Sequence, residues 1–152
     1  MRVLIVEDEI MAQKSLIRIL SQNFPELNVV GTATSVKGAV SWLKDPANKA
    51  DIIFMDVELS DGVCFEIFRQ VEVTSKVIMT TAYDSYALKA FEAGSIDYLL
   101  KPFGLKDITR ASEKALSLYE LLQLQEKRED QQDLAPHGSS CDAGAAYPGR
   151  SW

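Results

Sequence analysis

Four short apolar segments of the sequence each end in polar side chains suited to metal or phosphate chemistry. Glu7 and Asp8 follow the first of these segments, Asp56 the second, Thr81 the third and Lys101 the fourth. Clustered carboxylates without histidine or thiolate favour a hard cation with oxygen ligands, which means Mg²⁺ rather than zinc. A lysine and a threonine hydroxyl beside that cation are suited to bind phosphoryl oxygens. One acid, alone at the end of a buried strand, could be the nucleophile of phosphoryl transfer.

The elements that must position these side chains alternate along the chain. Runs rich in β-branched residues separate amphipathic stretches with helical spacing, which predicts five strands and five helices. This order implies a doubly wound α/β fold, a parallel sheet with right-handed crossovers and helices on both faces. The ligand site of such a sheet lies beyond the carboxyl ends of its strands. The expected strands are Val3–Val6, Leu27–Ala33, Ile52–Met55, Val77–Met79 and Ile96–Leu100.

Capping and breaking residues mark the expected helices. Ser35 is the expected N-cap of the second helix and Asp84 that of the fourth, which Gly94 ends. The first helix begins near Ile10, and the third carries the apolar residues of 65–71. The last helix is expected from Leu105 to about Lys127, longer than such a domain needs, and its apolar stripe is typical of a connector or coiled coil, with a frayed terminal helix as the alternative.

Composition narrows the functional classes. The chain has 152 residues, 47% of them hydrophobic, and a net charge of -6, which fits one globular domain and predicts no binding to nucleic acid or anionic lipid. The N-terminus lacks the basic stretch followed by an apolar stretch that is typical of a signal peptide. No apolar run approaches about 20 residues, so we expect a cytoplasmic protein without a membrane segment. Cys64 and Cys141 form neither a disulfide framework nor a metal site, and a lone His137 excludes histidine-based triads.

The composition changes near the end of the chain. Residues 135–152 are rich in Gly, Ala, Ser and Pro and have no periodicity. We therefore expect one domain over 1–127 with an extended last helix. Residues 128–152 are expected to be a linker or disordered tail, or a remnant of cloning.

Taken together, these motifs resemble the receiver domains of two-component response regulators, over roughly Met1 to Lys127. The resemblance rests on Glu7-Asp8, Asp56, Thr81-Ala82 and Lys101-Pro102-Phe103, in this order after successive strands. The stretches 81–91 and 95–102 look especially like the receivers that precede LytTR-type DNA-binding domains. The resemblance implies a flavodoxin-like fold, a sensor histidine kinase as partner, and control of an output domain absent from this chain.

The resemblance also implies a role for each acidic residue. Asp56 would accept the phosphoryl group. Asp8 and Asp56 would bind Mg²⁺ directly, together with the backbone carbonyl of Glu58, and Glu7 would act mostly through water. Such a domain is not an enzyme acting on a separate substrate, because it catalyses only its own phosphorylation and dephosphorylation.

Further positions would form the switch. Thr81 and Lys101 would contact the phosphoryl oxygens, with a cis bond between Lys101 and Pro102. Tyr98 matches the aromatic position that turns inward when the Thr81 hydroxyl moves. The face made by the fourth helix, fifth strand and fifth helix would then change its partner affinity, and homodimerisation there is plausible.

Four positions near Asp56 and Thr81 modify this picture. Glu58 and Tyr83, each two residues beyond a key position, match sites that govern water access to the acyl phosphate, and a bulky Tyr83 is expected to slow dephosphorylation. Ser60 and Cys64 depart from the family's frequent Pro and Gly, which puts the conformation of that loop in question more than the chemistry.

Three rival functions share parts of this pattern. A flavodoxin-like FMN protein needs a hydroxyl- and glycine-rich phosphate loop after the first strand, where Glu7-Asp8-Glu9 would repel phosphate. An aspartate-nucleophile phosphatase has its acidic pair after the first core strand, whereas Asp56 and Glu58 follow the third, and it would turn over an external phosphomonoester. A stand-alone receiver or a non-phosphorylated interaction module remains the alternative.

Overall fold

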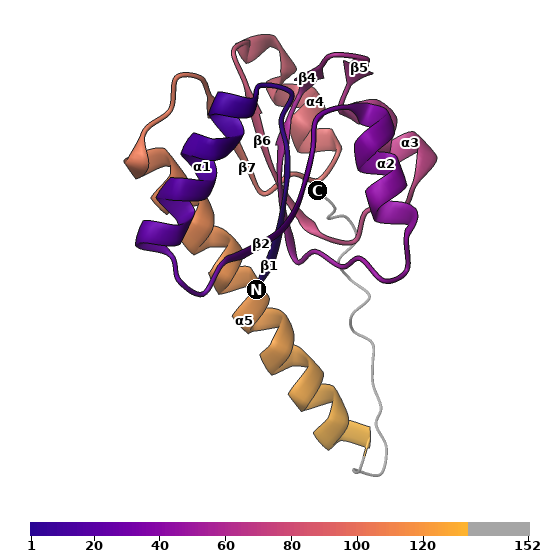
Figure 1. The fold of residues 1–152 in the computed structure, drawn as a ribbon. Helices are drawn as coiled ribbons and strands as arrows, with labels where there is room; N and C mark the ends of the chain where they lie inside the picture. Colours follow the sequence, from indigo (N-terminus) through magenta and orange to yellow (C-terminus); the bar gives the residue numbers. More distant parts are fainter. Residues whose placement is uncertain (134–152) are drawn as a thin grey trace.

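The computed structural model describes the backbone of residues 1–133 and the side chains of residues 1–128. A parallel sheet runs through the centre, with helices on both sides (Figure 1). Its strands are β1 (Arg2–Val6), β2 (Asn28–Ala33), β3 (Ile52–Asp56), β6 (Lys76–Thr81) and β7 (Asp97–Leu100). The helices are α1 (Ile10–Asn23), α2 (Val36–Lys44), α3 (Phe65–Gln70), α4 (Ala87–Glu92) and α5 (Leu105–Asp133).

The strand order confirms the predicted fold class. The order is β2-β1-β3-β6-β7 and every pairing between neighbours is parallel. The central strand β3 is buried at all five residues, as its uninterrupted apolar run predicted. The order reverses direction between β1 and β3, which is where an open α/β sheet places its ligand site.

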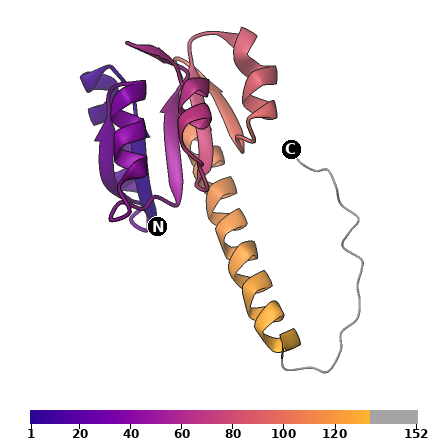
Figure 2. The same cartoon turned by 90° about the vertical axis from the view of Figure 1, so that its right-hand side faces the viewer.

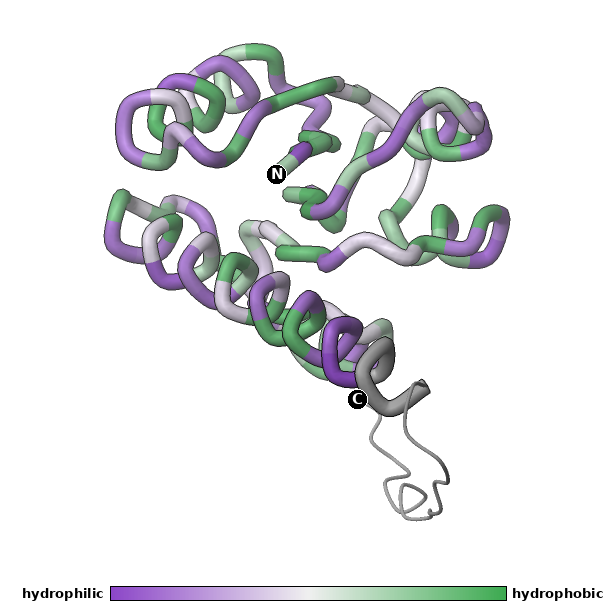
Figure 3. The backbone as a smooth tube through the Cα atoms, turned by 90° about the horizontal axis from the view of Figure 1, so that it is seen from below, coloured by the Kyte–Doolittle hydropathy of each residue, from purple (hydrophilic) through white to green (hydrophobic). Residues whose placement is uncertain are grey.

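Alternate side chains of the strands form two hydrophobic cores, one on each face of the sheet. One core joins Leu4, Ile53 and Met79 to helices α2, α3 and α4. The other joins Ile5 and Phe54 to helices α1 and α5. Figure 3 shows the hydrophobic strands lying between these helical layers. Both faces of the sheet are therefore covered by helices.

The N-terminus of α2 has two side-chain caps, of which the sequence indicated one. Ser35 Oγ accepts a hydrogen bond from the backbone N–H of Gly38 at 2.9 Å, as predicted. Asp61, from the loop after β3, accepts from the N–H groups of Val36 at 2.7 Å and Lys37 at 3.1 Å. These bonds hold the pKa of Asp61 below its ordinary value. The loop beside Asp56 is thus anchored to the neighbouring helix.

The region around the fourth helix differs from the prediction. Asp84 does not cap α4, because Asp84–Tyr86 form a separate 3₁₀ turn, η1, and α4 begins at Ala87 without a side-chain cap. A short antiparallel pair, β4 (Glu58–Leu59) with β5 (Gly62–Val63), was not expected. Gly62 has φ of 146°, a conformation open to glycine, and this sets the turn of the hairpin.

Helix α5 is longer than predicted and continues to Asp133 rather than to about Lys127. Among the side chains described up to residue 128, the last fully buried one on this helix is Ala115. Figures 1 and 2 show the remainder extending beyond the sheet. The tail expected over 135–152, with Cys141 and His137, lies outside the described residues. None of the helices within residues 1–133 combines the length and apolar character that crossing a bilayer requires.

Strand β2 carries a glycine whose replacement we expect to be destabilising. A Cβ added to Gly31 would lie 2.5 Å from Nε1 and 2.8 Å from Cε2 of the Trp42 ring, so the indole would have to move. We expect Gly31→Ala to lower the free energy of unfolding by about 1–3 kcal/mol through overpacking. Urea unfolding checks this value. The matched control is Gly104→Ala, where an added Cβ meets nothing within 4 Å. Equal stability of the two variants would contradict the prediction.

Candidate functional site

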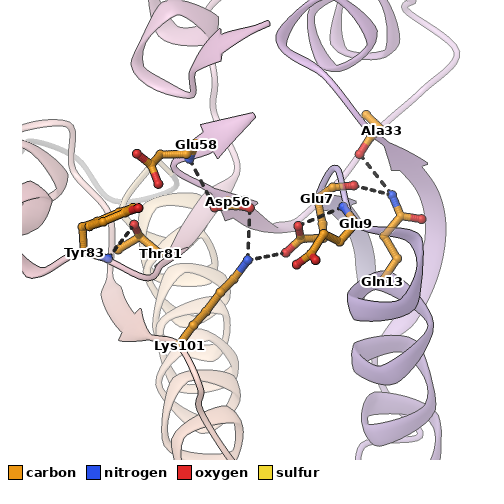
Figure 4. Close-up of polar contacts among 9 residues, drawn as sticks. All are labelled: Glu7, Glu9, Gln13, Ala33, Asp56, Glu58, Thr81, Tyr83 and Lys101. Carbon is orange, nitrogen blue, oxygen red and sulfur yellow. Dashed lines mark hydrogen bonds and ion pairs between the residues drawn. The ribbon is translucent and has the colours of Figure 1, made fainter. Parts of the chain in front are cut away.

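The carboxyl ends of the strands bring the predicted side chains together (Figure 4). Glu7 and Asp8 directly follow β1, Asp56 is the last residue of β3, and Lys101 directly follows β7. One carboxylate oxygen from each of Glu7, Asp8 and Asp56 lies within 4.8 Å of the others. The expected convergence of these residues at one edge of the sheet is therefore observed.

Lys101 connects two of these acids. Its Nζ lies 2.9 Å from Oε1 of Glu7 and 3.1 Å from Oδ2 of Asp56. Glu7 and Asp56 are buried, with 6% and 5% of their surface exposed. Two buried carboxylates that lie close together repel each other unless a cation lies between them. Lys101 provides this cation and therefore stabilises the pair.

The protonation behaviour of the site follows from burial and from these charges. Burial raises the pKa of Asp56 to about 7, and Glu7 adds to the increase while Lys101 opposes it. Burial also raises the pKa of Asp8, with a further contribution from Glu7. For Glu7 the effect of burial is outweighed by the hydrogen bonds from Lys101 and the N–H of Glu9, and its pKa lies below the ordinary value. The site therefore holds more carboxylate charge than its one lysine neutralises.

A metal ion is the species that fits such an excess of charge. The ligand atoms available within the cluster are carboxylate oxygens, which Mg²⁺ prefers. Burial is the main cause of the raised pKa of Asp56, and the charge of Glu7 adds to it. A divalent cation between the carboxylates would relieve this repulsion. The residues present therefore fit Mg²⁺.

Gln13 fixes the backbone of Glu7 by a hydrogen bond, a role that the sequence pattern did not indicate. The side chain of Gln13 is buried on α1. Its Nε2 donates to the backbone carbonyls of Glu7 at 2.7 Å and Ala33 at 3.3 Å, which links the loop after β1 to the end of β2. A glutamine at a core-facing helical position was the available signal, because a buried amide requires partners.

Thr81 and Tyr98, the predicted switch residues, both bond to the backbone of Tyr83. Thr81 is fully buried, and its Oγ1 accepts a hydrogen bond from the N–H of Tyr83 at 3.2 Å. The hydroxyl of Tyr98 donates to the carbonyl of Tyr83. The bond between Lys101 and Pro102 is cis, as the resemblance implied. Thr81 and Tyr98 are thus linked through one residue, whose own side chain is 54% exposed.

Glu58 is held from both ends. Its N–H donates to Oδ1 of Asp56 at 3.2 Å, and its Oε2 accepts from the hydroxyl of Tyr86 at 3.2 Å. Desolvation and the charge of Glu58 raise the pKa of Tyr86. The sequence did not single out Tyr86, because no local pattern connects residues so far apart in the chain.

Cys64 and Ser60, which depart from the family's frequent residues in the loop after Asp56, differ in burial. Cys64 is fully buried, and its N–H donates to the carbonyl of Val57 at 2.7 Å. Burial raises the pKa of its thiol to about 12, which keeps the group protonated and unreactive. Ser60 is exposed at the turn of the β4–β5 hairpin.

Known proteins match both the sequence and the fold. The family model of the response regulator receiver domain matches residues 3–113. The sensory transduction protein LytT of Bacillus anthracis is 38% identical over 117 residues, which cover 75% of this chain and 46% of that protein. The transcriptional regulatory protein LytR of Staphylococcus aureus is 38% identical over 119 residues, with the same coverages. This chain spans about half the length of these curated relatives.

Solved structures agree with this assignment. The response regulatory domain of protein mrkE from Klebsiella pneumoniae is 31% identical, with a TM-score of 0.69, and the match covers 80% of this chain and 99% of that one. The non-phosphorylated HemR receiver domain from Leptospira biflexa is 26% identical, with a TM-score of 0.63 and coverages of 76% and 94%. With the acidic cluster, the lysine and the threonine at the expected strand ends, this chain belongs to the response regulator receiver domain family and is related to the LytT and LytR regulators.

Proposed function

We propose that this chain is a phospho-accepting receiver domain, in which Asp56 accepts a phosphoryl group from the histidine of a sensor kinase. One observation carries the proposal. The Asp56 carboxylate lies at the end of the central strand, 3.1 Å from Lys101 Nζ and grouped with two further carboxylates. This arrangement combines a nucleophile, a cation for the phosphoryl oxygens and ligands for a metal ion.

The chemistry is an in-line displacement at phosphorus. An Asp56 carboxylate oxygen forms the new bond, and the bond from phosphorus to the kinase imidazole nitrogen breaks. Asp8, Asp56 and the backbone carbonyl of Glu58 are the proposed Mg²⁺ ligands, with Glu7 acting through water. When held there, Mg²⁺ would supply charge neutralisation for the phosphoryl oxygens. Lys101, already beside Asp56, pairs with one of these oxygens after transfer.

The response to phosphorylation starts at Thr81. An acyl phosphate of charge about -2 attracts the Thr81 hydroxyl. In the present structure this hydroxyl accepts a hydrogen bond from the N–H of Tyr83. Movement of Thr81 changes the environment of Tyr98. Tyr83, near the acyl phosphate, governs the access of water to that group. The α4–β7–α5 face, where Leu88 and Leu100 are exposed, then changes its affinity for partners, including a second copy of the domain.

The wider role follows from the relatives. We propose that the switch controls an output domain, of the LytTR DNA-binding type, in a cytoplasmic regulator. The receiver itself contacts neither nucleic acid nor membrane, since the net charge of the chain is -6. It acts on no separate substrate and turns over only its own phosphoryl group.

Intact mass spectrometry after incubation with Mg²⁺ and acetyl phosphate tests the proposal. We expect a gain of about 80 Da, one phosphoryl group, that requires Mg²⁺ and is absent in Asp56→Asn. Asp45→Asn, an exposed substitution at the end of α2, is the matched control and should retain the gain. Absence of any adduct, together with absence of a stable beryllofluoride complex, would instead favour a non-phosphorylated interaction module.

A further inference from the structure

A hydrogen bond across the edge of the site connects two segments that are remote in sequence. The hydroxyl of Tyr86, in η1, donates to Oε2 of Glu58, in β4, at 3.2 Å. We propose that Tyr86 is a positioning residue that restrains the Glu58 carboxylate and so lengthens the lifetime of phosphorylated Asp56. The inference rests on the proposed function, because it concerns the loss of the phosphoryl group.

The Tyr86 ring has anchors that do not depend on its hydroxyl. It packs against Phe65 of α3, with ring centroids 6.2 Å apart and planes inclined at 41°. The Tyr86 ring also packs against the core shared by α2, α3 and α4. Its neighbour Phe65 is itself contacted by Lys89, whose Nζ lies 5.8 Å from the centroid of the Phe65 ring. Removing only the hydroxyl therefore leaves the ring in place and releases Glu58.

Glu58 is placed so that a change in its side chain reaches the acceptor. Its backbone N–H is bonded to Asp56 Oδ1, which fixes the backbone next to the phosphorylated group. Its side chain extends to the Thr81 and Tyr83 side of Asp56, away from Lys101 (Figure 4). The bond from Tyr86 holds the carboxylate on that side and occupies one of its oxygens.

The step that this restraint affects is hydrolysis of the acyl phosphate. The oxygen of a water molecule bonds to phosphorus, the bond from phosphorus to the Asp56 oxygen breaks, and its electron pair returns to the Asp56 carboxylate. The water loses a proton, and a nearby carboxylate free to rotate can accept it, which speeds the reaction by general-base catalysis. A carboxylate turned aside and already hydrogen-bonded does this less well, so the Tyr86 bond slows hydrolysis.

The test is a double-mutant cycle on the phosphorylated lifetime. The wild type, Tyr86→Phe, Glu58→Gln and the double variant are loaded with acetyl phosphate and Mg²⁺, freed of donor, and followed by the decay of the mass gain of about 80 Da. We expect Tyr86→Phe to speed decay by about threefold or more, a small part of the about 100-fold or greater effect of a well-positioned general base. In the Glu58→Gln background the same change should have no effect, because no base remains to be released.

A matched control separates this role from a structural one. Tyr119→Phe removes a hydroxyl on α5 whose contact is with Gln123, and it should decay like the wild type. An unchanged lifetime in Tyr86→Phe, or an equal acceleration with and without Glu58, would overturn the inference while leaving the proposed function intact. If the wild type forms neither an adduct nor a stable beryllofluoride complex, the proposed function fails and the inference fails with it.

Discussion

Replacing Lys101 by methionine is expected to destabilise the metal-free protein at pH 8 by about 3 kcal/mol. The substitution keeps the aliphatic chain but removes the cation that lies 2.9 Å from Glu7 and 3.1 Å from Asp56. Two buried carboxylates then face each other without compensation, and breaking one side of a buried ion pair is among the costliest single changes. The measurement is urea unfolding in EDTA. We also expect the rate of adduct formation from acetyl phosphate to fall more than about tenfold.

The control for this result is Lys106→Met. Lys106 is exposed on the first turn of α5, so its loss should change neither stability nor phosphorylation noticeably. The cost of Lys101→Met should also shrink at pH 5, where Asp56 is protonated and the repulsion disappears. A cost that is the same at pH 5 and pH 8 would show that Lys101 stabilises the fold by packing rather than by charge.

The substitution Asp56→Asn is expected to make the metal-free protein more stable than the wild type at pH 8. The folded state protonates Asp56 near pH 7, whereas the unfolded chain does so near 3.8, so the folded state binds more protons between these values. The stability due to this group is therefore fully present below about pH 4 and is lost as the pH rises through about 7. We expect Asp56→Asn to gain about 2 kcal/mol at pH 8, or about 6 °C in Tm.

Thermal unfolding in EDTA from pH 5 to pH 8 checks this expectation. The difference in Tm between the variant and the wild type should grow with pH. Added Mg²⁺ should reduce it, because a cation held by the proposed ligands Asp8 and Asp56 would stabilise the wild type by mass action. A variant that is less stable than the wild type at every pH would contradict the unfavourable burial of the Asp56 charge.

The sequence was sufficient to predict the sheet and the residues that lie at the carboxyl ends of its strands. The apolar runs before Glu7, Asp56 and Lys101 are unambiguous, and parallel strands bring their carboxyl ends to one edge regardless of loop details. The cap at Ser35 is a local signal, since its hydroxyl bonds to an N–H three residues away. Such features depend on neighbours in sequence or on the topology alone.

The features that escaped prediction depend on tertiary contacts. The strands β4 and β5 have two residues each, too few for any alternating pattern. Asp84 has the chemistry of an N-cap, yet the chain forms a 3₁₀ turn there, and Tyr86 of this turn bonds to Glu58. The role of Gln13 likewise depends on carbonyls from two other segments. In each case the deciding partner is remote in sequence.

The extension of α5 beyond the sheet has a mechanical consequence. Past Ala115 the helix continues from 116 to 133 and is about 27 Å long at 1.5 Å per residue. A rigid rod of this length magnifies angular displacement at its base, so that a tilt of about 10° moves the far end by about 5 Å, close to the rise of one helical turn. A rearrangement near β7 that tilts α5 by this amount would therefore displace Asp133 by about the spacing between successive turns.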